Sequence, residues 1–264
     1  MRILILILIF TASLSAQETV YHKGIVIDSL KISDTIDGSY SLYLPTKFDG
    51  KKEFPVVFIF DGKGRGLSAA RLFQPAAEEQ GYILVSSNNV DPEKELKENL
   101  AVAALLVQKV SNNLPVDIRS ISVAGLAEGA KVATALPLIF NGIHGIIFIG
   151  DHFFNFDLLK KSKPTTLVGI VGNQQVDFGE MEMAAFQLKA LSIPTQLYVF
   201  EGGEEWPDPQ LISSAVGNLT LQGMRTGKRP KDQVLVDKLY REDLSRGDQM
   251  MSTGNYMMAR NFLD

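Results

Sequence analysis

The chain has 264 residues, of which 45% are hydrophobic and 21% are charged, and its formal net charge is −4. This composition fits one globular domain with a large core, and the acidic balance excludes the basic surface that nucleic-acid binding requires. No cysteine is present, which excludes disulfides, thiolate metal sites and lipid attachment through cysteine.

The N-terminus has the pattern of a secretory signal peptide. Met1-Arg2 gives a basic start, an apolar run follows at 3–10, and small residues lead to Ala16. The apolar run is too short to span a bilayer. We therefore expect residues 1–16 to be cleaved and the protein to be exported, periplasmic or secreted, with no membrane span afterwards. The alternative is an apolar N-terminal strand.

Two partly alternating runs, 19–30 and 39–44, flank the turn signal Asp37-Gly38 and predict an antiparallel edge pair. Apolar runs typical of buried strands follow at 54–60, 82–85, 118–124, 145–150, 166–172 and 195–200. Helical spacing lies between and after them at 69–80, 92–113, 129–136, 180–191 and 209–217. We expect Asp91 to cap the second of these helices and Pro137 to end the third.

This alternation predicts an α/β fold with a mostly parallel sheet, helices on both faces and right-handed crossovers. After Gly227 the pattern changes to two charged helices, 232–246 and 254–264, which predict a helical C-terminal extension over 228–264. The run from Gly254 to Leu263 resembles part of a tetratricopeptide-type hairpin. A plain helix that packs on the domain is the alternative. In either case, a protein partner would bind through these C-terminal helices.

The run 121–130 joins a buried strand to a helix through Gly125-Leu126-Ala127-Glu128-Gly129. Its glycine spacing is that of the G-x-S-x-G turn, in which a strained strand-to-helix connection presents a nucleophilic serine. The middle residue here is Ala127, whose methyl group has no proton to give and no lone pair to attack with.

With this turn, the chain resembles the α/β-hydrolase superfamily, in particular secreted esterases similar to polyhydroxybutyrate depolymerases and feruloyl esterases. The resemblance covers about 39–225 and also involves the runs 40–45, 73–82 and 202–207. It implies an α/β-hydrolase domain over 17–227. It also implies a general-base histidine where Glu204 stands and an acid where Gln175 stands, with Asp177 two residues on. Asp61 precedes Gly62 where the family has histidine.

Loss of either the serine or the histidine costs on the order of a millionfold in a serine protease. The sequence therefore predicts a non-catalytic homologue that binds a small-molecule or polymer-derived ligand, or a partner protein. Main-chain amides of Glu128 and of 62–64 are expected to remain as an anion-binding pair. The candidate residues for this crevice are Asp61, Gly62, Lys63, Glu128 and Trp206.

The alternative function is an active esterase that uses displaced residues. Ser86 ends one strand, and Asp151 and His152 follow another, at the edge where open α/β sheets bind ligands. A third reading makes the domain an interaction module. Glu204, Glu205 and Asp61 show no metal-binding spacing, so we expect neither a metal site nor a cofactor.

Overall fold

The computed structural model describes residues 22–34, 37–157, 159 and 166–262. The expected signal peptide, residues 1–16, lies outside the described residues and stays a prediction. Within the described residues, no helix has both the length and the apolar character needed to cross a membrane.

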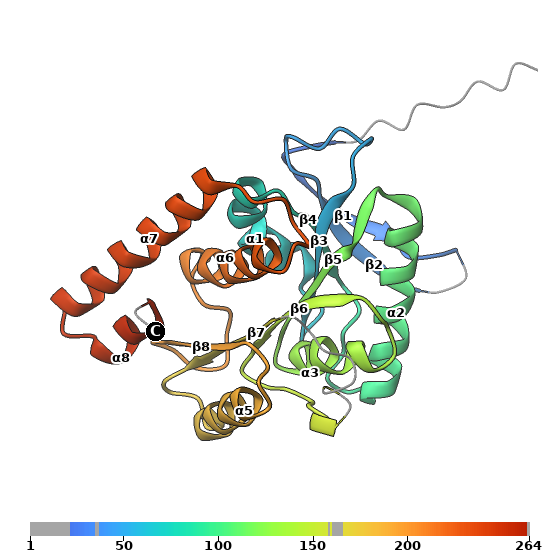
Figure 1. Ribbon diagram of the computed structural model, residues 1–264. Helices are drawn as coiled ribbons and strands as arrows, with labels where there is room; N and C mark the ends of the chain where they lie inside the picture. Colours follow the sequence, from blue (N-terminus) through green and yellow to red (C-terminus); the bar gives the residue numbers. More distant parts are fainter. Residues whose placement is uncertain (1–21, 35–36, 158, 160–165, 263–264) are drawn as a thin grey trace, which may run out of the picture.

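The centre of the molecule is an eight-stranded sheet in the order β1-β2-β4-β3-β5-β6-β7-β8 (Figure 1). The strands are β1 Val26–Lys31, β2 Ser39–Tyr43, β3 Phe54–Asp61, β4 Ile83–Ser87, β5 Val116–Leu126, β6 Ile143–Ile149, β7 Thr166–Gly172 and β8 Thr195–Phe200. The β1–β2 and β2–β4 pairs are antiparallel, and every other pair is parallel. The predicted parallel sheet with an antiparallel N-terminal edge is confirmed.

Helices cover both faces of this sheet. They are α1 Gly66–Gln80, α2 Leu96–Asn113, α3 Glu128–Ala135, α5 Phe178–Ala190, α6 Pro209–Arg225, α7 Gln233–Ser252 and α8 Tyr256–Ala259, with 3₁₀ helices η1 Leu136–Leu138 and η2 Arg260–Phe262. One core cluster packs α2, α3 and α5 on the sheet, and the other packs α1 and α6 on the opposite face. Strand β3 supplies both clusters, because Val56 and Phe58 point to one face and Val57 and Ile59 to the other.

Helix α2 begins four residues later than the sequence predicts. Asp91 is not its cap, because the Asp91 main chain is held by the Asn99 side chain, at 3.1 and 2.9 Å, in a turn before the helix. The Glu98 carboxylate instead accepts the Glu95 amide at 3.2 Å, as in a capping box. Pro92 therefore belongs to the turn.

The C-terminal helices pack along one end of the domain. Helix α7 lies outside α6 in Figure 1, and α8 lies beside β8. The Asn261 side chain accepts the Val199 amide at 2.9 Å and donates to its carbonyl at 2.7 Å. This pairing covers part of the open edge of β8, which limits edge-to-edge association. The single helix expected over 254–264 is instead the short α8 followed by η2.

The contact between α6 and α7 contains a half-buried carboxylate. Burial raises the pKa of Asp243, and the hydrogen bond from Ser214 and the charge of Arg246 lower it by less. A carboxyl whose pKa is raised on folding stabilises the fold below its unfolded pKa of about 3.9, and this contribution is lost as the pH rises through the folded pKa. The packing of α7 should therefore weaken toward neutral pH.

We expect Asp243→Asn to flatten this pH dependence, because asparagine keeps an acceptor for Ser214 but carries no charge. Between pH 4 and 8, the unfolding midpoint of the variant should fall by about 1–2 °C less than that of the wild type. Differential scanning fluorimetry checks the difference, with the exposed Asp248→Asn on the same helix as the matched control. Parallel curves for wild type and Asp243→Asn would contradict the prediction.

Candidate active site at the elbow after strand β5

The strand-to-helix turn at Leu126–Gly129, here called the elbow, has the strained backbone that the glycine pattern predicts. Ala127 has φ 54° and ψ −123°, a conformation that costs free energy for a residue with a Cβ. The Ala127 amide donates to the Ile149 carbonyl at 3.0 Å, and its carbonyl accepts the Ala130 amide at 2.8 Å. These bonds hold the half-exposed Ala127 at the carboxyl end of β5.

Two glycines allow α3 to approach the sheet closely enough to form this turn. A Cβ on Gly125 would lie 2.1 Å from the Gly129 carbonyl oxygen, and one on Gly129 would lie 1.9 Å from the Phe60 carbonyl oxygen. Both contacts are with backbone, so side-chain rotation cannot relieve them. The tight crossing of α3 over β3 and β5 therefore needs glycine at both positions.

The three positions assigned to a catalytic triad meet at the end of β6. Ala127 bonds to Ile149, and a Cβ on the next residue, Gly150, would lie 3.1 Å from Gln175 Nε2 and 3.3 Å from Glu204 Cγ. Gln175 also donates a short hydrogen bond to the Gly150 carbonyl. A carboxylate could not make that bond, so glutamine fits this place as a structural residue. The Glu204 side chain is exposed and forms no hydrogen bond or ion pair with a described residue.

Asp61 connects the two loops beside the elbow. Its buried carboxylate accepts Trp206 Nε1 at 2.6 Å, the Lys63 amide at 2.8 Å, and Arg65 Nη2 and Nε at 2.9 and 3.0 Å. Burial raises the pKa of this carboxyl, but the hydrogen bonds from Arg65, Trp206 and Lys63 outweigh that effect and bring the pKa below its ordinary value. With four donors, Asp61 holds the loops together and is not free to bind a ligand.

The main-chain donors differ in part from the expected set. The Lys63 amide is taken by the Asp61 carboxylate and the Gly64 amide by the Asp61 carbonyl, so neither is available. Among the turn and loop hydrogen bonds of the described residues, none has the amide of Gly62 or of Glu128 as its donor. A Cβ on Gly62 would lie 3.0 Å from the Glu128 nitrogen, so these two residues are in contact. They are the remaining candidates for an oxyanion-binding pair.

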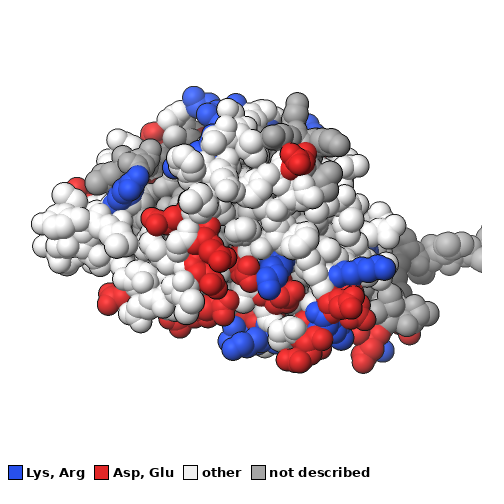
Figure 2. All heavy atoms as spheres, turned by 90° about the horizontal axis from the view of Figure 1, so that it is seen from below, with Lys and Arg blue, Asp and Glu red and all other residues white. Residues whose placement is uncertain are grey.

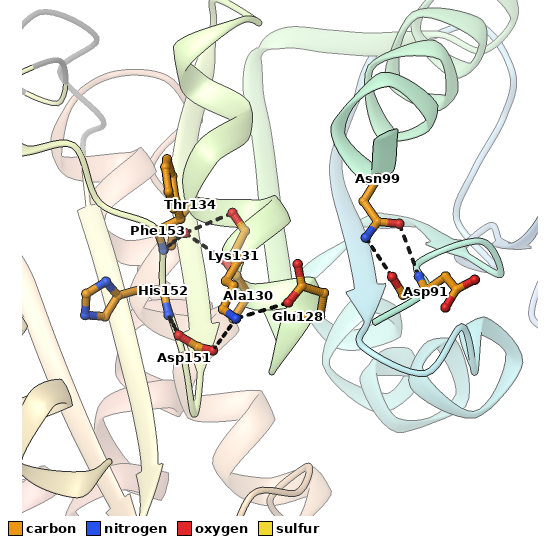
Figure 3. A network of polar contacts seen from close by, with 9 residues as sticks. All are labelled: Asp91, Asn99, Glu128, Ala130, Lys131, Thr134, Asp151, His152 and Phe153. Atoms are coloured by element: carbon orange, nitrogen blue, oxygen red, sulfur yellow. Dashed lines mark hydrogen bonds and ion pairs between the residues drawn. The ribbon is translucent and has the colours of Figure 1, made fainter. Parts of the chain in front are cut away.

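Charged side chains on α3 and on the loop after β6 lie beside the elbow. Lys131 Nζ lies 3.1 Å from both the Glu128 and the Asp151 carboxylates, so it neutralises part of the negative charge there (Figure 3). Thr134 Oγ1 accepts the Phe153 amide at 2.7 Å and fixes this loop to α3. Acidic side chains also gather on the face drawn in Figure 2. This distribution disfavours anionic substrates.

The displaced residues Ser86, Asp151 and His152 do not form a catalytic unit. Ser86 is fully buried in β4, and β3 and β5 separate that strand from β6, roughly 14 Å at ordinary strand spacing. The Asp151 carboxylate accepts the His152 main-chain amide at 2.7 Å, while the His152 ring points away from it (Figure 3). That ring stacks on Phe154 at 4.7 Å, and burial lowers its pKa. The alternative catalytic trio of Ser86, His152 and Asp151 is therefore not assembled in the structure.

Two parts of the site were missed by the sequence reasoning. The Asp61–Arg65 ion pair has i,i+4 spacing, which is a readable signal, but its contact with Trp206 joins residues 145 positions apart. The Lys131 bridge likewise depends on Asp151, from a different loop. Across the described residues, no group of three or more His, Cys, Asp or Glu side chains is arranged to hold a metal ion.

Comparison with solved structures identifies the fold. A hyperthermophilic esterase from Pyrobaculum calidifontis matches with a TM-score of 0.60 and 16% identity over 76% of this chain and 87% of that one. An S-formylglutathione hydrolase from Staphylococcus aureus matches at 0.59 and 14%, over 76% and 99%. Esterase 2 from Thermogutta terrifontis, phosphonylated by sarin, matches at 0.59 and 14%, over 80% and 99%. No protein-family model and no curated protein sequence matches this chain.

These matches confirm the fold that the resemblance implies, and they correct the main functional prediction. The sequence predicts a non-catalytic binding homologue, whereas the structures named above are all of esterases or hydrolases.

Proposed function

We propose that this chain, which has the α/β-hydrolase fold, hydrolyses carboxylic esters at its elbow, with water as the nucleophile and Glu204 as the general base. The observation that carries the proposal is the approach of Glu204 to Gly150, next to the backbone that holds Ala127. The structural similarity to esterases supports ester hydrolysis as the reaction class.

The missing serine hydroxyl sets the form of this mechanism. Ala127 offers no nucleophile. Ser86, the alternative nucleophile that the sequence suggests, is buried in the sheet. Ala127 is partly exposed, so a water molecule from solvent would serve as the nucleophile. Glu204 is the carboxylate at the position of the family's base, and its exposed side chain has no competing partner among the described residues.

The reaction balances without a cofactor. The water oxygen attacks the ester carbonyl carbon while Glu204 accepts one water proton. The amides of Gly62 and Glu128 donate to the carbonyl oxygen as it becomes negatively charged. When the tetrahedral intermediate collapses, the C–O bond to the alcohol breaks, and Glu204 returns its proton to the leaving alkoxide. The products are a carboxylic acid and an alcohol.

A direct assay tests the proposal. We expect the purified protein to hydrolyse short neutral esters such as p-nitrophenyl acetate above the buffer rate. We also expect no covalent adduct with a fluorophosphonate probe by intact mass spectrometry, because no activated serine takes part. Absence of hydrolysis across neutral esters of different chain lengths would overturn the function. A phosphonate adduct on a serine would overturn the water mechanism but leave esterase activity in place.

A further inference from the structure

A cavity lies where the C-terminal helices meet the domain. Its volume is about 570 Å³, within the range of small-molecule sites. The end of β8, the start of α6, the last turns of α7 and the α8–η2 segment enclose it. The cavity therefore exists only because α7 and α8 pack against this end of the sheet.

One part of the cavity wall is aromatic and thioether. Its large apolar side chains are Phe200, Trp206, Met250, Met258 and Phe262. The Trp206 ring is held in place, because its Nε1 donates to Asp61 and the ring meets Phe73 edge-on at 5.5 Å. Aromatic faces attract cations, and methionine side chains adapt to irregular apolar groups.

The charged part of the wall is acidic. Glu201 and Glu205 are exposed, and neither carboxylate forms a hydrogen bond or ion pair with a described residue. Asp208 caps α6 by accepting the Gln210 and Leu211 amides at 2.8 and 2.9 Å.

Among the described residues that line the wall, the basic one is Arg246, and its Nη1 is already engaged. Its Nη1 donates to the Gln210 carbonyl and to Ser214 Oγ, and the charge of Asp243 lies close enough to interact with it. These two bonds use the Nη1 hydrogens and reduce the number of donors that the guanidinium can offer to an anion. Two unpaired carboxylates beside aromatic rings favour a positively charged guest.

We propose that this cavity binds a small organic cation, of the ammonium or quaternary ammonium class with apolar substituents. The cation would lie against the aromatic wall, with Glu201 and Glu205 supplying the opposite charge. An anion would be repelled by these two carboxylates. A neutral guest of the same shape would keep the apolar contacts and lose the charge interaction.

Choline and its uncharged isostere 3,3-dimethylbutan-1-ol separate these contributions. We expect isothermal titration calorimetry to give choline an affinity at least about tenfold higher. The double change Glu201→Gln and Glu205→Gln should reduce the ratio to about one, whereas the exposed Glu93→Gln, near the start of α2, should leave it unchanged. Added salt should also lower the affinity for choline more than the affinity for the alcohol.

Equal affinities for the two compounds, or no binding of either at 10 mM as a rough upper limit, would overturn the proposal. So would an undiminished preference for choline in the double variant. The readout involves no ester, so failure here leaves the proposed hydrolysis untouched, and failure of the hydrolysis assay leaves this site untouched.

Discussion

Replacing Glu204 with glutamine is expected to reduce kcat/KM for p-nitrophenyl acetate by about a thousandfold. Glutamine has almost the same shape but cannot accept the water proton, so the variant loses the general base and little else. General-base catalysis contributes about 10²–10⁴-fold, and a thousandfold loss equals about 4 kcal/mol of transition-state free energy. Steady-state kinetics on protein purified in the same way measure the effect, which should appear mainly in kcat.

The matched control is Glu182→Gln, an exposed glutamate on α5 that the proposed mechanism does not use. Its kinetics should equal those of the wild type. If Glu204→Gln kept the wild-type rate, another group would have to accept the proton and the assignment of Glu204 would be wrong. The comparison also shows whether the measured rate belongs to this protein, because a contaminating esterase would not respond to the substitution.

The largest expected effect on stability comes from Gly129→Ala. Helix propensity alone predicts a gain, because alanine is favoured over glycine by about 1 kcal/mol in a helix. The new methyl group would, however, lie 1.9 Å from the Phe60 carbonyl oxygen, so α3 must move away from β3. Overpacking costs about 1–3 kcal/mol, and a contact with rigid backbone belongs at the upper end. We expect unfolding in urea to show a loss of about 3 kcal/mol.

Gly179→Ala provides the matched comparison. Gly179 is also helical, in α5, and a Cβ there meets no atom within 4 Å. The same chemical change should therefore leave stability unchanged or raise it by up to about 1 kcal/mol. Equal stability of the two variants would show that α3 is not held against β3 as tightly as the geometry implies.

The fold was readable from the sequence because each strand and helix carries a local pattern. Continuous apolar runs predicted β7 at 166–172 and β8 at 195–200 with the observed bounds, since parallel strands are buried on both faces. The glycines at 125 and 129 predicted the elbow, because close backbone approach needs them. The start of α2 was misplaced because Asn99, inside the helix, binds the Asp91 main chain and holds 91–94 in a turn.

The site was harder to predict, since its important contacts join distant parts of the chain. Motif spacing located positions 127, 175 and 204, and the structure brings them to the end of β6. Ser86 and His152 looked suitable because both follow apolar runs, but strand order decides their separation, and a sequence does not state strand order. Asp61 looked like a pocket carboxylate until its four donors were known.

Trp206 is the single tryptophan among the 264 residues, and its indole is bonded to Asp61, beside the elbow, and also lines the cavity at the C-terminal helices. Its ultraviolet emission therefore comes from one defined place in the protein. A ligand bound in this cavity or at the elbow should shift the emission maximum or change the fluorescence intensity, so binding can be followed without attaching a dye.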